Sequence, residues 1–306
     1  MITKIVRTLV TVLLALTMTF ILMKAIPGDP FQDEQGVPEE VLVNVRKHWG
    51  LEDPLIVQYG RFLRSALTLD FGPSLKYQEH TVREIIIQGA PISFRLGVQA
   101  LILALPLGIF IGAFMAALHG GISSAIATLV SSLGVSMPTF VAAASLQFFL
   151  AISIPIFPVA RWGDFAHTVL PTLALAIGPA FHISRLMKAS LLDVYTQPYI
   201  WTARMKGLNE FQVLTKHALK NALLPLLPYI GPMAANILVG SFVVERVFAI
   251  PGLGQWFVNS VLNRDYPLIG AMTLLYSIIL LVLHILVDAI QKRLDKRLTL
   301  QESYLS

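Results

Sequence analysis

Long apolar stretches alternate with polar segments along the whole chain. A helix needs about 20 apolar residues to cross a hydrocarbon core roughly 30 Å thick. Six stretches reach that length, near residues 8 to 27, 96 to 118, 122 to 153, 168 to 187, 222 to 245 and 267 to 290. The pattern predicts an all-α integral membrane protein with six transmembrane helices.

The first and third stretches have features of their own. The third is too long for one straight helix, and Pro138 inside it removes a backbone hydrogen bond and clashes with the preceding turn. We therefore expect a kink or a tilt there. The first stretch follows Lys4 and Arg7, but its apolar run is long and no small-x-small cleavage site precedes Pro27. An uncleaved anchor helix is expected rather than a signal peptide.

Composition supports the membrane assignment. Hydrophobic residues make up 55% of the 306 residues and charged residues 13%, and the mean hydropathy is +0.69. Such values lie outside the range of soluble domains. The absence of cysteine from the sequence excludes disulfides, thiolate catalysis and cysteine metal sites.

The short loops carry an uneven distribution of Lys and Arg, which sets the orientation of a membrane protein. With both termini in the cytoplasm, only Arg161 and Arg264 fall in short outer loops. Twelve basic residues then lie inside: Lys4, Arg7, Arg185, Lys188, Arg204, Lys206, Lys216, Lys220, Lys292, Arg293, Lys296 and Arg297. We expect a multi-pass membrane protein with both termini inside, and the net charge of +5 needs no nucleic-acid partner.

This orientation divides the chain into four segments. Residues 1–27 form an N-terminal transmembrane anchor helix, and residues 28–94 form a small extracytoplasmic helical subdomain between helices 1 and 2. Residues 95–290 form the transmembrane core with a cytoplasmic loop at 188–221, and residues 291–306 form a cytoplasmic tail.

A basic island runs from Pro198 to Pro225, with the sequence PYIWTARMKGLNEFQVLTKHALKNALLP. Pro198 suits a first helical turn, and Gly207 can adopt the left-handed conformation that ends a helix. Asn209 then caps a second helix, with Gln212 reaching back as in a capping box. The first helix mixes apolar and basic residues, which favours either a groove on a partner protein or the surface of the anionic inner leaflet.

At these residues the chain resembles the permease subunits of ABC importers, whose cytoplasmic loop carries a Glu-Ala-Ala motif followed by Gly. Ala203 and Gly207 match this motif, whereas Trp201 and Thr202 replace the Glu and the first Ala, and Lys220 replaces an expected Pro. The segments TARMKGL and HALKNALLP are similar to those of the peptide-permease branch, specifically the B-type subunit of oligopeptide importers. Three stretches support this branch: IPGDPF at 26 to 31, GLEDPLIVQYGRFL with DFGPSLKY across 50 to 77, and ERVFAIPGLGQWFVNSVLNRDYPL at 245 to 268.

The resemblance implies a type I ABC importer permease fold in the bacterial cytoplasmic (inner) membrane and the import of oligopeptides delivered by a binding protein. It implies four partners besides the lipid bilayer: a homologous second permease, two cytoplasmic ATP-binding subunits and an extracytoplasmic substrate-binding protein. The 28–94 subdomain would either help to seat that binding protein or only cover the outer helix ends. The resemblance assigns coupling to the ATPase to Ile200, Trp201, Ala203, Arg204, Met205, Lys206 and Gly207.

A transported peptide needs a wet path, because each unpaired amide in hydrocarbon costs on the order of several kcal/mol. Pro225, Pro228 and Pro232 break the inner half of the fifth stretch. Nearby polar or small residues either line a path or pack helices closely, and Gly108 and Gly112 fit packing better. The candidate path residues are Ser136, Gln147, Asn236, Gly240 and Ser241.

The sequence contains no catalytic signature of the common kinds, and we expect a non-enzymatic subunit without metal or cofactor. GxxxxGK[ST], HExxH and GxSxG are missing, and the seven histidines are scattered. Three alternatives stay open: import of dipeptides, nickel or glutathione, secondary transport driven by an ion gradient, or intramembrane proteolysis. The protease would use Ser136 or Ser241 with His182 or His284, although helix contacts explain both histidines better.

Overall fold

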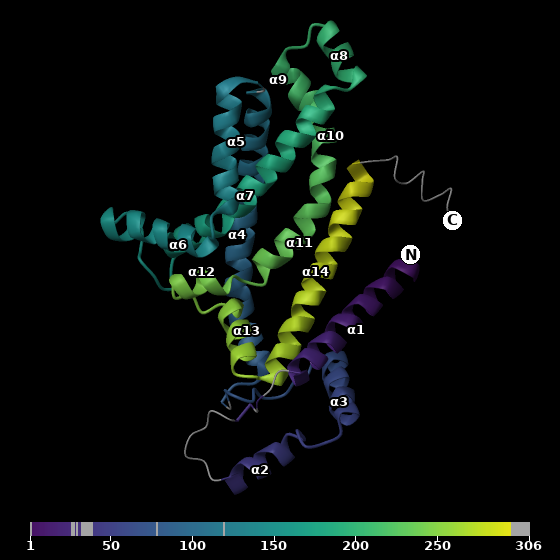
Figure 1. The fold of residues 1–306 in the computed structure, drawn as a ribbon, viewed down its shortest axis with the longest axis vertical. Helices are drawn as coiled ribbons and strands as arrows, with labels where there is room; N and C mark the ends of the chain where they lie inside the picture. Colours follow the sequence, from purple (N-terminus) through teal and green to yellow (C-terminus); the bar gives the residue numbers. More distant parts are fainter. Residues whose placement is uncertain are drawn as a thin grey trace. The chain divides into compact units, whose positions relative to one another are not determined.

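The computed structural model describes residues 2–25, 28, 30–31, 39–77, 79–118 and 120–294, with the side chains of 2–9, 39–40 and 294 left out. Most of the IPGDPF stretch, the tail beyond 294 and the side chains of Lys4 and Arg7 therefore lie outside the description. Within the described ranges the regular elements are helices (Figure 1).

The chain divides into two compact units. The first comprises residues 1–92 and 252–281, and the second comprises 93–251 and 282–306. Two of the three divisions fall inside long helices, α4 (Val82–Ala117) and α14 (Tyr266–Leu294), and the third lies just before Leu253. One division lies beside the expected subdomain boundary at 94, but residues 252–281 group with the N-terminal part of the chain.

The first unit contains the start of α4, the first part of α14 and four further helices. These are α1 (Ile2–Ala25), α2 (Glu39–His48), α3 (Leu55–Thr68) and α13 (Leu253–Leu262). Its core joins α4, α13 and α14 through Val82, Ile85, Leu253, Leu268 and Met272, all nearly fully buried. A smaller cluster joins α1, α3 and α14 through Leu16, Ala66 and Leu274.

A buried carboxylate connects two loops of the first unit. Asp265, which precedes α14 and is fully buried, accepts a hydrogen bond from the hydroxyl of Ser74. It also accepts from the backbone N–H groups of Leu75 and Leu268, each at 3.3 Å. The DFGPSLKY and NRDYPL stretches, distant in sequence, therefore contact each other.

The second unit is built around α7 (Phe165–Tyr195). Packed against it are α5 (Gly121–Ser136), α6 (Thr139–Gln147) and α10 (Leu219–Leu223). The other elements are η1 (Phe148–Ser153), α8 (Pro198–Met205), α9 (Glu210–Val213), η2 (Leu214–Ala218), η3 (Leu224–Leu226), α11 (Leu227–Leu238) and α12 (Phe242–Val247). Of these, η1 and η2 are π-helical and η3 is a 3₁₀ turn.

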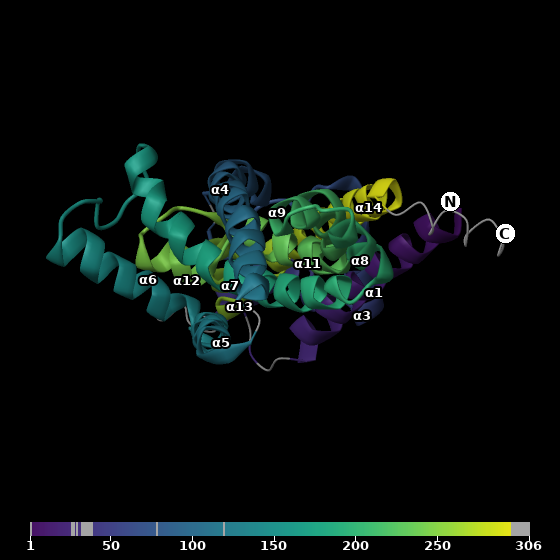
Figure 2. The ribbon, with the colours of Figure 1, turned by 90° about the horizontal axis from the view of Figure 1, so that it is seen from above.

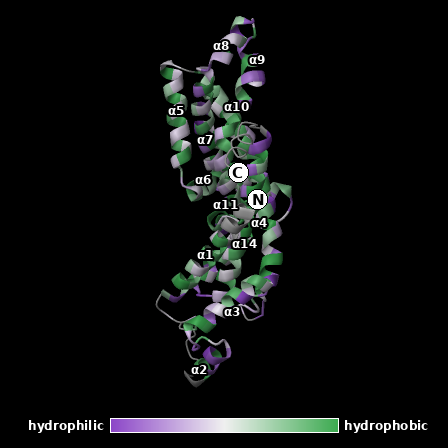
Figure 3. Ribbon diagram, turned by 90° about the vertical axis from the view of Figure 1, so that its right-hand side faces the viewer, coloured by the Kyte–Doolittle hydropathy of each residue, from purple (hydrophilic) through white to green (hydrophobic). Residues whose placement is uncertain are grey.

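Among the described residues, four helical segments are long and apolar enough to cross a membrane: Val82–Ala117, Phe165–Tyr195, Glu210–Val247 and Tyr266–Arg293. A fifth candidate is the pair Gly121–Ser136 and Thr139–Ser153, and a shorter apolar helix covers Val10–Ala25. The described parts of the six apolar stretches lie mainly on these helices, while the number of crossings stays a prediction. Hydrophilic residues concentrate near α8, α9 and α2 (Figure 3).

The expected irregularity at Pro138 is confirmed and is larger than a kink. The two helices of the pair meet at an angle of 96°. Viewed from above, α5 is seen nearly end-on while α6 lies across the view (Figure 2). Pro138 cannot donate to the preceding turn, and its own carbonyl accepts from Val141 at 2.9 Å to start α6.

The expected close packing of α4 is also confirmed. A Cβ atom built on Gly108 would lie 2.7 Å from the Cβ of Ile183, and one on Gly112 would lie 2.6 Å from the Cβ of Met187. The glycines therefore let α4 and α7 approach closely. His182 makes the expected helix contact, stacking on Tyr229 of α11 with ring centroids 4.3 Å apart.

We predict that Gly112→Ala destabilises the protein through this contact. Its new Cβ would overlap Met187 and the carbonyl of Ser184, and such overpacking typically costs about 1–3 kcal/mol. Gly178→Ala in α7 is the matched control, because its Cβ would meet no described atom within 4 Å. Thermal unfolding in detergent should show a lower midpoint for Gly112→Ala alone. Equal midpoints for the two variants would contradict the packing role.

Candidate functional site

The candidate site is the elbow formed by α8 and α9, which lies between α7 and the broken helix that follows. After α7 ends at Tyr195, a short turn leads into α8, which begins at Pro198 in its first turn as expected. Proline suits this position because its fixed φ is helical and its missing N–H would be unpaired there.

The helix α8 has one buried face and one exposed face. Ile200 and Ala203 are 0% and 4% exposed, while Trp201 and Met205 are 58% and 86% exposed. Residues three or four positions apart share a helix face, so each pair marks one side of α8. The structure thus separates the predicted coupling residues into an internal anchor and an outward surface.

The turn after α8 has the geometry expected of Gly207. Gly207 has a φ of +81°, and its N–H donates to the carbonyl of Arg204 at 2.9 Å. The N–H of Leu208 donates to the carbonyl of Ala203 at 3.4 Å, which completes a Schellman motif. The helix end therefore depends on a left-handed residue at position 207.

The predicted capping box at the start of α9 is confirmed. The side chain of Asn209 accepts from the N–H of Gln212 at 2.9 Å, and the side chain of Gln212 accepts from the N–H of Asn209 at 3.2 Å. Both helices of the elbow therefore have defined ends, with a two-residue connection between Lys206, the cap of α8, and Asn209.

A salt bridge that sequence reasoning missed crosses the turn. Arg204 donates from Nε to Oε1 of Glu210 at 2.8 Å and from Nη2 to Oε2 at 3.1 Å. This hydrogen bonding raises the pKa of the Arg204 guanidinium above its ordinary value. The guanidinium also lies 5.6 Å and 5.8 Å from the ring centroids of Tyr195 and Trp201.

A cavity of about 960 Å³ opens beside the elbow. Its lining combines the last residues of α4, the end of α7 and the elbow, including Tyr195, Trp201, Arg204, Glu210 and Phe211. Phe211 is 72% exposed and was also missed, because a single aromatic residue beside a helix cap carries no distinctive sequence signal. The elbow is tied to α10 by a hydrogen bond of 2.7 Å from Asn221 to the hydroxyl of Tyr199.

Beyond the elbow, prolines shape the helix that contains the candidate path residues. In a regular helix the carbonyls of Asn221 and Leu224 would accept from the residues four positions on, but these are Pro225 and Pro228, which have no N–H. The two carbonyls accept instead from the N–H groups of the residues three positions on. This shift explains the 3₁₀ turn η3. Exposed residues follow one face of α10, η3 and α11 at helical spacing: Asn221, Pro225, Pro228, Pro232 and Asn236.

Ser136 and Gln147, two other path candidates, lie on other helices than this exposed face. Ser136 is exposed at the end of α5, beside the break at Pro138. Gln147 donates from Nε2 to the carbonyls of Val159 and Val247, at 2.8 and 3.2 Å. Its amide therefore joins segments of the second unit.

Gly240 and Ser241 lie together where α11 passes into α12. Gly240 has a φ of +106°, and the hydroxyl of Ser241 caps α12 by accepting from the N–H of Val244 at 3.5 Å. These two residues form a helix break, whereas Asn236 lies on the exposed face of α11.

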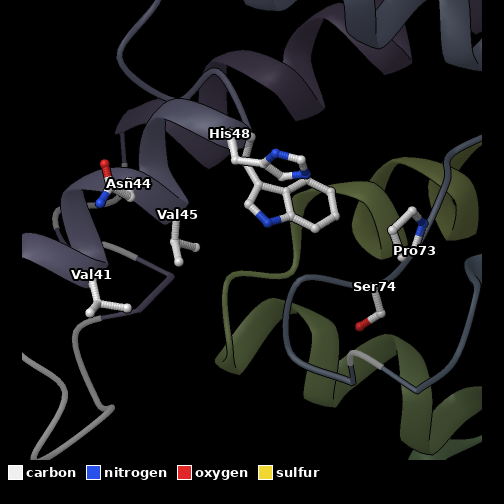
Figure 4. A pocket seen from close by; sticks show the side chains of 7 residues that line it. Val41, Asn44, Val45, His48, Pro73 and Ser74 are labelled. Carbon is white, nitrogen blue, oxygen red and sulfur yellow. The ribbon is translucent and has the colours of Figure 1, made fainter.

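A second hollow, of about 570 Å³, lies within the first unit between α2 and the loop before α4 (Figure 4). Val41, Asn44, Val45 and His48 line it from α2, with Trp49 directly after that helix. Pro73 and Ser74 line it from the loop. The same Ser74 donates to buried Asp265, so the hollow borders the contact between the two loops.

Together, the apolar helices and the elbow at a helix junction define a polytopic membrane permease. Residues 108–300 match the family described as binding-protein-dependent transport system inner membrane component, and residues 1–89 match the N-terminal region of such components. The chain belongs to this family of ABC importer permeases, in which separate subunits hydrolyse ATP. It is accordingly a multi-pass protein of the inner membrane and is not itself catalytic.

Relatives with assigned functions match along almost the entire chain. It is 43% identical to the dipeptide transport system permease protein DppB of Bacillus subtilis, over 95% of each chain. It is 36% identical to the oligopeptide transport system permease protein OppB of Haemophilus influenzae, over 96% of this chain and 97% of that one.

Solved structures support the fold. An amino acid ABC transporter with histidines matches with a TM-score of 0.50 and 18% identity, over 68% of this chain and 94% of that one. The MetNI methionine ABC transporter in inward-facing conformations matches with a TM-score of 0.50 and 19% identity, over 69% and 96%. The type I permease fold expected from the sequence is confirmed.

Proposed function

We propose that this chain carries short peptides through the membrane and that an ATPase subunit drives it through the elbow. The observation that carries the proposal is the two-faced helix α8. Ile200 and Ala203 anchor it inside the chain, so Trp201 and Met205 are free to contact another protein. Neighbouring large apolar side chains that form one exposed patch with polar residues around it mark a contact site.

The proposed complex contains a homologous second permease, two ATP-binding subunits and an extracytoplasmic binding protein. Family membership supports a binding-protein-dependent system. The residue 28–94 region, with its hollow between α2 and Pro73, is the proposed seat of the binding protein. Peptides are the proposed cargo, and the higher identity to the dipeptide permease favours dipeptides over the oligopeptides expected from the sequence.

The proposed path follows the exposed face of η3 and α11. Broken helix at membrane depth is tolerated where it lines a cavity or packs in protein. Pro225, Pro228 and Pro232 interrupt the backbone donors on this face, and Asn236 adds an amide one turn further. Ser136 is a second candidate, whereas Gln147, Gly240 and Ser241 support the path by shaping its helices. The second permease would close the other side.

The proposed mechanism switches between two states of access. ATP-driven closure of the ATPase pair would displace α8, and the fixed turn at Gly207 would pass this displacement to α9 and the broken helix behind it. A nucleotide or a cargo can shift such an equilibrium only by its differential affinity for the two states. The permease therefore needs a stiff connection at the elbow and a deformable helix beyond it.

The proposed orientation places the elbow and both termini in the cytoplasm. The cysteine-free sequence allows single-cysteine variants to test it. We expect Met205→Cys to react with an impermeant maleimide in inside-out vesicles and not in right-side-out vesicles. Ala203→Cys, on the buried face of the same helix, is the control and should react much more slowly. Rapid labelling of Met205→Cys in right-side-out vesicles would contradict the orientation.

Gly207→Val should uncouple ATP hydrolysis from uptake without preventing membrane insertion. A residue with a Cβ in the left-handed region costs roughly 1–2 kcal/mol, and β-branching makes it worse. Gly207→Asn is the matched control, since asparagine tolerates this conformation and a Cβ at 207 would meet no described atom within 4 Å. The measurement is peptide uptake per ATP hydrolysed in proteoliposomes. Normal coupling in Gly207→Val would count against the elbow.

The cargo is tested by transport in proteoliposomes that contain the whole complex. We expect saturable uptake of labelled dipeptides that requires internal ATP and the binding protein. An excess of unlabelled dipeptide should reduce this uptake, and an excess of nickel or glutathione should not. Uptake that survives ATP depletion but collapses with the proton gradient would instead support a secondary transporter.

A further inference from the structure

The salt bridge across the Gly207 turn is the feature from which we draw a further inference. Arg204 lies in the last turn of α8 and Glu210 is the first residue of α9, and two hydrogen bonds of 2.8 and 3.1 Å join them. Paired contacts of a guanidinium with a carboxylate fix orientation as well as distance. The bridge therefore restrains the angle between the two helices.

The other contacts of the turn also restrain the angle between α8 and α9. Two backbone hydrogen bonds close the end of α8, and the capping box of Asn209 and Gln212 closes the start of α9. Tyr195 and Trp201 lie near the guanidinium and limit its rotamers. The turn is held by local contacts on both sides, which is unlike a hinge.

We propose, on the basis of the proposed function, that Arg204 and Glu210 are a positioning pair that makes the elbow one rigid body. The pair holds α8 and α9 so that Trp201, Met205 and Phe211 meet the ATPase subunit together. Without the bridge, α9 could rotate about the turn and Phe211 would leave this shared surface.

The chemistry of the surface specifies the partner's contact region. Trp201, Met205 and Phe211 are between 58% and 86% exposed, and Trp201 and Phe211 line the same cavity. The exposed Lys206 and Lys216 border these residues in sequence. The complementary ATPase surface presents apolar side chains surrounded by acidic residues, in keeping with the basic balance of the island.

A rigid elbow moves the deformation to the next segment of the chain. The π-helical turn η2 follows α9 directly, and the 3₁₀ turn η3 lies one short helix further on. Irregular turns inside long helices often mark functional bends. Because the hydrogen bond from Asn221 to Tyr199 ties the elbow to α10 across η2, displacement of the elbow is absorbed at Leu224–Leu226, while the Gly207 turn keeps its shape.

Charge exchange tests the pair in the reconstituted complex. Arg204→Glu and Glu210→Arg each place like charges together and should lower peptide import per ATP hydrolysed by about fivefold, as expected for loss of an exposed ion pair. The double variant Arg204→Glu with Glu210→Arg restores opposite charges and should recover most of this ratio. Parent-like single variants, or a double variant no better than the worse single, would overturn the pairing.

A covalent lock distinguishes a rigid elbow from a flexing one. Since the sequence has no cysteine, Arg204→Cys with Glu210→Cys can be joined selectively by a short bifunctional thiol reagent. The unlinked variant should couple poorly, and linking should restore import. Loss of import on linking would show that the turn must bend, and it would overturn the proposal.

Failure of this inference is distinguishable from failure of the proposed function. Met205→Glu places a charge in the contact surface without touching the bridge, and it should abolish coupled import if the elbow meets the ATPase. Impaired Met205→Glu with normal Arg204→Glu would overturn the positioning pair alone. Normal import by both variants would overturn the elbow as the coupling site.

Discussion

The architecture depends on the requirement that backbone N–H and C=O groups be paired wherever water is absent. Long helices meet this requirement by themselves, so every interruption in the apolar segments needs a replacement partner. At the break before α6 the carbonyl of Pro138 accepts from Val141, and at the break before α12 the hydroxyl of Ser241 accepts from Val244. Gln147 supplies its amide to two carbonyls beyond η1. The breaks therefore occur where the sequence provides such partners.

The same requirement accounts for the stiffness that the proposed coupling role of the elbow needs. In α8 the buried Ile200 and Ala203 fix the helix against the rest of the second unit, and the Schellman motif and the capping box pair the backbone groups at its end. Few unpaired groups remain that could rearrange when a partner pushes on the helix. By contrast, the proline-rich segment that follows the elbow has 3₁₀ hydrogen bonds in place of some α-helical ones at η3. A small further change of its backbone would therefore cost little free energy.

Features that depend on neighbouring residues could be predicted from the sequence. Pro198, Gly207 and the Asn209 cap each follow from backbone preferences that act within a single turn. Contacts between distant segments could not be predicted in this way. The hydrogen bonds of Gln147 are an example, because its partners lie 12 and 100 residues away and an amide in an apolar stretch carries no sign of them.

The salt bridge of the elbow could not be predicted from the sequence for a related reason. Arg204 and Glu210 are six residues apart, a spacing that places them on different faces of a continuous helix. Only the reversal at Gly207 brings them together. The split between buried and exposed coupling residues likewise required the packing of α8, because all seven residues belong to one contiguous motif.

The buried carboxylate of Asp265 explains why the DFGPSLKY and NRDYPL stretches, which resemble those of peptide permeases, contact each other. An ionised carboxylate removed from water is costly unless hydrogen-bond donors surround it. Asp265 has donors from Ser74, Leu75 and Leu268, two of which come from the DFGPSLKY stretch. Each loop supports the other, because without Ser74 and Leu75 the carboxylate would keep only the N–H of Leu268, and without Asp265 the hydroxyl of Ser74 would lose its acceptor. The hollow beside Ser74 therefore has a floor held by the start of α14, which suits the binding-protein seat proposed for this region.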